Sequence, residues 1–192
     1  NQILSFGQPK NGTYAYLAIA GGIDVPPVMG SRSTYMKAEL GGVEGRALTK
    51  GDVLYCREKQ SIKREFRLSP ELIPTYGSEK KARVIVGPDE KAFYQESLTR
   101  FLSESYKVTS QSDRMGARLE GPELLTKHGA DIISAAVLPG TIQVPSNGQP
   151  IVLLADRQTT GGYTRIATVI SSDLPFVAQS LPGQSLRFQA VT

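Results

Sequence analysis

The 192-residue chain has few of the residues that build disulfides, zinc sites and nucleophilic triads, since it holds one cysteine and one histidine. Cys56 on its own cannot form an intramolecular disulfide, so the fold does not depend on an oxidising compartment and we expect a cytoplasmic protein. The usual zinc site needs more ligands than these, and a Ser-His-Asp triad would have to use His128 in the loop-like stretch TKHGAD. We therefore expect neither a metal site nor triad chemistry.

Long apolar runs and the common phosphate-binding motifs are absent as well. No run approaches the roughly 20 apolar residues that span a bilayer, and the chain does not start with a charged-then-apolar leader. We expect no membrane partner. There is no GxxxxGK[ST] motif and no GxGxxG motif between a strand and a helix. Any nucleotide must therefore be held in another way.

The basic residues are not arranged as a nucleic-acid-binding surface. The net charge is +4, and the densest basic cluster, CREKQSIKREFR at residues 56–67, offers only Phe66 as an aromatic. Nucleic-acid binding favours a basic stripe with several stacking aromatics. We expect no nucleic-acid partner and interpret the cluster as a solvated face or a small anion-steering patch.

The 19 glycines and 12 prolines indicate many turns and therefore many strands. Residues 3–6 and 13–20 read as two antiparallel strands around an Asn11-Gly12 turn, and residues 47–56 as a turn that leads into a short strand. Residues 21–34 read as a structured loop. Further strands are expected at 83–86, 106–111, 135–138, 143–144, 150–155, 164–170 and 185–191.

Two helices are expected between these strands. One runs from Asp89 to about Ser103 and the other from about Asp173 to Leu181, with Asp89 and either Ser172 or Asp173 as N-caps. The total of about nine or ten strands and two helices predicts a mainly β fold, a barrel with helices that plug or flank it.

Three polar loops on this scaffold each carry an arginine. In DRQTTGGY, residues 156–163, a carboxylate and a guanidinium follow a buried strand, and the Thr hydroxyls with the Thr-Gly-Gly amides can form a nest for an anion. The alternative is a hairpin in which Asp156 pairs with Arg157 and the glycines supply positive φ. The candidate residues of this loop are Asp156, Arg157, Gln158, Thr159, Thr160, Gly161, Gly162 and Tyr163.

The other two loops repeat the same chemistry. SDRMGARLEG, residues 112–121, supplies Ser112, Asp113, Arg114, Arg118 and Glu120, and its alternative is an Arg-carboxylate network that only holds a loop. GSRST, residues 30–34, supplies Ser31, Arg32, Ser33 and Thr34, and its alternative is a serine-rich turn. Three such loops favour a pocket for a small acidic ligand, although no spacing argument proves that they converge.

The same loops carry a family resemblance. GGIDVPPVMGSRST, SDRMGARLEGP and VLPGTIQVPSNGQPIVLLADRQTTGGYTRIATVI closely resemble the C-terminal two thirds of the family of the 5-oxoprolinase C subunit, also described as allophanate hydrolase subunit 2 (Kip-type). The resemblance implies a cyclophilin-like β-barrel. The polar, proline-containing stretch before residue 80 gives an expected division into N-terminal strands with a Gly/Pro loop (1–57), a polar excursion or linker (58–80) and a barrel portion (81–192). Family members carry an additional N-terminal segment, and we expect this chain to begin after it.

The resemblance also implies a function. It implies an enzyme subunit that acts with 5-oxoprolinase subunits A and B, the latter of the Kip-inhibitor type, to open 5-oxoproline to glutamate with ATP and Mg²⁺, and that is inactive alone. Phosphorylation of the lactam oxygen would need an anion clamp from Arg32, Arg114 and Arg157, with Asp156 or Asp113 as the base if this subunit supplies one. The alternatives are a biotin-dependent carboxyltransferase subunit of the urea amidolyase type and a regulatory protein that binds a histidine-kinase inhibitor.

Overall fold

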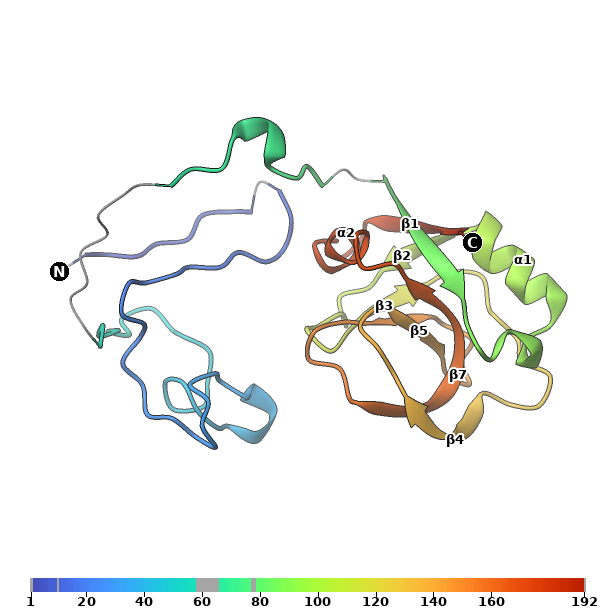
Figure 1. Cartoon of the computed structure of the whole chain (residues 1–192), viewed down its shortest axis with the longest axis horizontal. Coiled ribbons are helices and arrows are strands. Elements are labelled where there is room, and N and C mark those ends of the chain that lie inside the picture. The colour runs from blue at the N-terminus through green and yellow to red at the C-terminus, as the bar shows by residue number, and fades with distance from the viewer. Residues whose placement is uncertain (1, 10, 58–65, 77–78, 192) are drawn as a thin grey trace. The chain divides into compact units, whose positions relative to one another are not determined.

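The computed structural model describes residues 2–9, 11–57, 66–76 and 79–191. The chain divides into two compact units, one of Asn1–Ala15 with Pro74–Thr192 and one of Tyr16–Ile73 (Figure 1). The expected boundaries at residues 57 and 80 stay a prediction, and residues 58–65, which hold most of the basic cluster and part of the expected linker, lie outside the described residues.

The larger unit is a β-barrel. Its strands are β1 (Glu79–Val86), β2 (Ser105–Val108), β3 (Gly116–Glu120), β4 (Asp131–Ala136), β5 (Thr141–Val144), β6 (Ile151–Leu153), β7 (Thr160–Val169) and β8 (Ser185–Ala190). They lie in the order β1-β8-β2-β3-β6-β5-β7-β4, and β1 also pairs with β7. That extra pairing closes seven strands into a ring and leaves β4 attached to the first half of β7 (Figure 1). The predicted mainly β barrel with two helices is confirmed.

The core lies inside the ring and beneath the helices. Alternation along the strands turns side chains such as Leu186 and Phe188 of β8 inward, both 1% exposed or less. Helix α1 (Gln95–Ser103) packs against β8, where Phe101 stacks on Phe188 with ring centroids 4.6 Å apart. Burial of such a side chain contributes roughly 1.5–3 kcal/mol, so this aromatic contact fixes α1 to the barrel.

Both expected helices exist, but they begin in another way than the sequence pattern indicates. Helix α1 starts at Gln95, after a separate 3₁₀ turn, η3 (Glu90–Ala92), and the carboxylate of Asp89 makes no cap hydrogen bond. Helix α2 (Leu174–Ala178) follows Asp173, which is at the N-cap position but likewise makes no side-chain cap bond. The expected capping by aspartate is wrong at both positions because each carboxylate binds a distant arginine.

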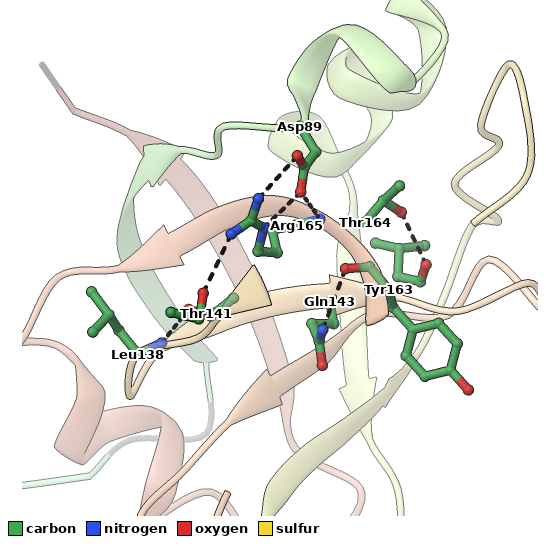
Figure 2. Close-up of polar contacts among 9 residues, drawn as sticks. Asp89, Leu138, Thr141, Gln143, Tyr163, Thr164 and Arg165 are labelled. Atoms are coloured by element: carbon green, nitrogen blue, oxygen red, sulfur yellow. Dashed lines mark hydrogen bonds and ion pairs between the residues drawn. The ribbon is translucent and has the colours of Figure 1, made fainter. Parts of the chain in front are cut away.

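The two arginines come from strands. Arg165 of β7 donates to Asp89 through its backbone N–H (3.0 Å), Nε (2.7 Å) and Nη2 (3.1 Å), as Figure 2 shows. Arg83 of β1 donates to Asp173 through its backbone N–H (2.8 Å), Nε (2.9 Å) and Nη2 (2.7 Å). Each pair lowers the pKa of its aspartate through the hydrogen bonds of the guanidinium. The carboxylates therefore tie the start of each helical segment to the barrel.

The two expected N-terminal strands are wrong, because residues 3–6 and 13–20 form no strand. The backbone groups of a strand need hydrogen-bond partners on a neighbouring strand, and the turn at Asn11 binds residues 74–76 instead. The side chain of Asn11 donates to the carbonyl of Pro74 (3.1 Å) and accepts from the N–H of Tyr76 (3.0 Å). The N–H of Thr13 donates to Gln179 Oε1 (2.7 Å). The segment is thus anchored by side chains, and the described residues form eight strands where nine or ten were expected.

The smaller unit, Tyr16–Ile73, contains the 3₁₀ turns η1 (Met36–Ala38) and η2 (Pro70–Leu72). Residues 21–34 form the expected irregular loop, whereas the strand expected near residue 56 is reduced to a single bridge between Ile23 and Cys56. Arg46 and Asp52 hold the turn at residues 49–52, with an Nη1–Oδ2 distance of 2.8 Å. Within the described part of the chain, no helix is long and apolar enough to cross a membrane.

Candidate functional site

Two of the three predicted loops lie side by side at one end of the barrel, at the point where β3 begins and β6 ends. Gly116 of β3 pairs with Leu153 of β6. Beyond that pair, the N–H of Leu154 donates to the carbonyl of Met115 and the N–H of Asp156 to the carbonyl of Arg114, both at 2.9 Å. The backbone therefore brings residues 112–118 and 156–159 together into one surface, which we call the arginine rim.

Arg114 and Asp156 form a two-point ion pair across the rim. Arg114 Nε lies 2.7 Å from Asp156 Oδ2, and Nη2 lies 3.0 Å from Oδ1. This pair excludes the internal Asp156-Arg157 pairing that a plain hairpin would use. Hydrogen bonding from Arg114 lowers the pKa of Asp156, so the carboxylate is an anion whose charge Arg114 balances. Both side chains are about half exposed.

Asp113 and Ser112 hold the first loop of the rim in shape. Asp113 Oδ1 accepts the N–H groups of Met115 (2.8 Å) and Gly116 (3.1 Å). Ser112 Oγ accepts the N–H of Arg118 (3.0 Å) and donates to its carbonyl (3.3 Å). The loop is therefore held by side-chain bonds to backbone groups, which leave the exposed side chain of Arg118 on the outer face of β3.

Arg157 differs from the other arginines of the barrel. Its Nε is buried, and among the residues that the structure describes it has no hydrogen-bond partner. A buried N–H without an acceptor costs roughly 1–3 kcal/mol, and more when the group is charged. Native structures rarely keep such a group unless a ligand or a partner satisfies it. Arg157 therefore carries a buried donor on the rim whose need for an acceptor an anion would meet.

The glycine pair of the second loop lies in a strand. Thr160 and Gly161 belong to β7 and pair with Ala136 and Ala135 of β4, and neither Gly161 nor Gly162 has a positive φ. The interpretation of this pair as a positive-φ turn is wrong. A Cβ on Gly161 would lie 2.5 Å from Gln143 Nε2, so the glycine makes room for a neighbouring side chain.

Gln143 is a residue that the motifs missed. It lies on β5, is 2% exposed, and accepts a hydrogen bond from Gln158 Nε2 (3.1 Å). Its own Nε2 donates to the carbonyl of Tyr163 (3.3 Å; Figure 2). The ring of Tyr163 points away from these contacts and is 41% exposed. A signal was available in the sequence, because a glutamine inside the apolar stretch TIQV must find buried partners.

The third predicted loop belongs to the other unit. Ser31 Oγ accepts the N–H of Ser33 (3.1 Å), and Arg32 Nε donates to the carbonyl of Val25 (3.1 Å). The loop packs on two glycines: a Cβ on Gly42 would lie 1.9 Å from Thr34 Oγ1, and one on Gly41 would lie 2.3 Å from the carbonyl oxygen of residue 33. The loop is built tightly, and its participation in the same site as the rim stays a prediction.

The residues of the rim are suited to anion and amide recognition. No group of three or more His, Cys, Asp or Glu residues that could hold a metal ion occurs in the parts of the chain described here. The fold and the rim together define a class of protein, a closed mainly β barrel with two flanking helices and an arginine-rich surface at one end.

Within that class, the chain belongs to the family of the carboxyltransferase domain, subdomain A and B, which matches residues 1–190. It is similar to the 5-oxoprolinase C subunit of Escherichia coli, at 43% identity over 187 residues that cover 97% of this chain and 59% of that protein. The corresponding protein of Haemophilus influenzae is 38% identical over 191 residues, which cover 100% of this chain and 60% of that protein. The chain thus spans about three fifths of the length of these curated relatives.

A solved structure shares the fold. The crystal structure of the K. lactis urea amidolyase superposes with a TM-score of 0.77 at 29% sequence identity. The match covers 90% of this chain and 12% of that one.

Proposed function

We propose that this chain is part of the C subunit of an ATP-dependent 5-oxoprolinase, which converts 5-oxo-L-proline, ATP and water to L-glutamate, ADP and phosphate. The likeness to two 5-oxoprolinase C subunits over nearly the whole chain supports this assignment. The observation that carries the site is the buried Nε of Arg157, which lacks a partner among the described residues. A substrate with a carboxylate supplies the acceptor that this group needs.

The rim residues take different roles in this proposal. Arg157 binds an anionic group of the substrate, the carboxylate or the phosphoryl group on the activated lactam oxygen. Arg114 stabilises the charge that develops there, and Asp156 orients Arg114 through their two-point pair. With its lowered pKa, Asp156 fits this orienting role better than that of a general base, which needs a pKa closer to the working pH.

The ATP site is assigned to a surface shared with partner subunits. This sequence contains neither of the common phosphate-binding motifs, and the described residues contain no cluster of metal ligands for the accompanying Mg²⁺. We therefore assign ATP no site formed by this chain alone. Subunits A and B are the proposed partners, and the cytoplasm is the proposed location.

The test is to reconstitute the full-length protein that contains this chain with its partner subunits and to measure glutamate formed from ATP and 5-oxoproline. Arg157→Ala and Asp156→Asn should lower turnover by about tenfold or more while the complex still assembles, because each removes charge stabilisation at the rim. The matched control is Arg187→Ala, an exposed arginine of β8 away from the rim. Normal turnover in both rim variants would contradict the proposed site.

A second candidate function is a carboxyl transfer of the urea amidolyase type. The family is described as a carboxyltransferase domain, and the likeness to the urea amidolyase structure supports this candidate. Biotin would then be the cofactor. A complex that forms no glutamate from 5-oxoproline but carboxylates a small amide when supplied with carboxybiotin would establish this candidate in place of the first.

A further inference from the structure

Two glutamine side chains form a chain of hydrogen bonds from a buried position on β5 to the rim. Gln143 is held at both ends of its amide, with Oε1 accepting from Gln158 Nε2 and Nε2 donating to the carbonyl of Tyr163. Gln143 is 2% exposed, and the space above it is kept by Gly161. An amide fixed in this way has one orientation, so it fixes the orientation of the amide that it binds.

Gln158 has hydrogen-bonding capacity left over. Its Nε2 carries two hydrogens and uses one on Gln143, while no group in the described chain donates to its Oε1. The side chain is half buried and lies next to Arg157 in the sequence, on the rim. The free edge of Gln158 therefore presents one donor and one acceptor on the same loop as Arg157.

We propose that Gln158, oriented by Gln143, recognises the amide edge of the substrate, so that the site takes ligands with an N–H next to a C=O and an anionic group nearby. The inference rests on the proposed 5-oxoprolinase function and deepens it. In a lactam the ring holds the N–H and the C=O on the same side. A primary amide matches that edge with two hydrogen bonds, its oxygen accepting the lactam N–H and its N–H donating to the lactam oxygen.

This arrangement gives discrimination as well as affinity. A site built to bond both groups leaves Gln158 and the ligand poorly paired when the ligand lacks the carbonyl, as proline does, and unpaired polar groups reject such analogues strongly. Arg157 binds the carboxylate that 5-oxoproline and proline share. The carboxylate contact and the amide contact are therefore separable by mutation.

The experiment uses the reconstituted complex and compares Gln158→Met, Gln143→Met and Gln149→Met. Gln149 is the matched control, since its side-chain amide also forms hydrogen bonds with the backbone. Its Oε1 accepts from the N–H of Gly121 (2.9 Å), and its Nε2 donates to the carbonyl of Gly121 (3.2 Å). It follows the 146–147 turn at the opposite end of the β3–β6 pair. Gln143→Met and Gln149→Met both remove amide–backbone bonds, so both should lower the Tm, and only the first should affect the rim.

The expected result is a rise of about tenfold or more in KM for 5-oxoproline in both variants, because Gln158→Met removes the two proposed substrate hydrogen bonds and Gln143→Met removes the bond that orients Gln158. KM for ATP should stay within about twofold of the wild type. Proline should inhibit Gln158→Met competitively with an inhibition constant equal to or lower than that of the wild type. Gln149→Met should keep the wild-type KM for 5-oxoproline.

Two results would overturn the inference while the proposed function stands. One is a wild-type KM for 5-oxoproline in Gln158→Met, and the other is an equal rise in KM in Gln143→Met and Gln149→Met, which would make the role of Gln143 structural. If the wild-type complex forms no glutamate from 5-oxoproline, the proposed function fails and this inference fails with it.

Discussion

Arg157 and Arg114 both lie on the rim, yet their surroundings differ, and the proposed roles of the two arginines follow from this difference. Arg114 uses its guanidinium to bind Asp156, whereas the buried Nε of Arg157 finds no acceptor in the described chain. A buried N–H without an acceptor lowers the free energy of unfolding, so selection for stability alone would not favour this arrangement. The proposed anion contact of Arg157 would supply the missing acceptor.

Arg157→Met should therefore act in opposite directions on stability and activity. Removing the unsatisfied Nε is expected to leave the free energy of unfolding unchanged or to raise it by up to about 1 kcal/mol. Turnover of the reconstituted complex should fall by about tenfold or more. Urea unfolding of this protein and glutamate formation by the complex measure the two effects, and a variant that loses stability without losing activity would make Arg157 a structural residue.

The pair of Arg114 and Asp156 is expected to contribute little to stability. Both side chains are about half exposed, and exposed pairs are typically worth below about 1 kcal/mol because solvent screens them. A double-mutant cycle with Arg114→Met and Asp156→Asn, read by urea unfolding, should give a coupling energy in that range. A coupling of several kcal/mol would show that the pair holds the fold, not the site.

At the scale of elements, the two helical segments show how tertiary contacts override a local signal. Asp89 and Asp173 each stand where a helix cap is expected, and sequence pattern alone cannot tell a capping carboxylate from one that binds an arginine 76 or 90 residues away. The apolar pattern did place the end of α1 at Ser103 and the body of α2. Propensity therefore predicts that a helix exists, whereas the residue at which it starts depends on the distant arginine that its aspartate binds.

The ion pair of Asp173 and Arg83 should make stability depend on acid. The hydrogen bonds from Arg83 lower the pKa of Asp173 to about 2 in the folded protein, below the value of about 3.9 of a free aspartate. Because the pKa is lowered in the folded protein, the pair contributes fully to the free energy of unfolding above about pH 4, and this contribution is lost as the pH falls from 4 towards 2.

Asp173→Ala is the corresponding variant, with the exposed Asp131→Ala of β4 as its control. At pH 7 the Asp173→Ala change should cost about 2 kcal/mol in urea unfolding, since three hydrogen bonds to a mostly buried carboxylate are lost. The difference from the wild type should shrink as the pH falls towards 2. A difference that stays constant from pH 7 to pH 2 would contradict the assigned role.

At the scale of the whole molecule, the barrel carries its own core. The side chains of the main hydrophobic cluster all lie between Ala82 and Phe188. The ring closes through β1, which pairs with β8 on one side and with β7 on the other. A closed ring leaves no unpaired edge among its seven strands, so the larger unit contains what an independent fold requires.

Residues 74–192 alone should therefore fold. We expect a single cooperative thermal transition by circular dichroism, with a Tm within about 5–10 °C of that of the whole chain, because residues 1–73 supply none of the side chains of the main hydrophobic cluster and the truncation removes bonds such as those of Thr13 and Tyr14 to Gln179. A spectrum without β structure, or a broad non-cooperative melt, would show that residues 1–73 are needed for the barrel.

The amino-acid sequence by itself determined the mainly β class, most barrel strands and the polar loops of the rim. These follow from local properties, such as alternation, the turns at Gly140 and Gly148, and charged residues at the ends of strands. Only the tertiary structure decided which groups meet. It paired Asp156 with Arg114 instead of Arg157, placed Gln143 beneath Gly161, and left residues 3–6 and 13–20 without strand partners. The physical reason is that a hydrogen bond or an ion pair needs two groups close in space, and closure of the barrel brings together residues that are far apart in the chain.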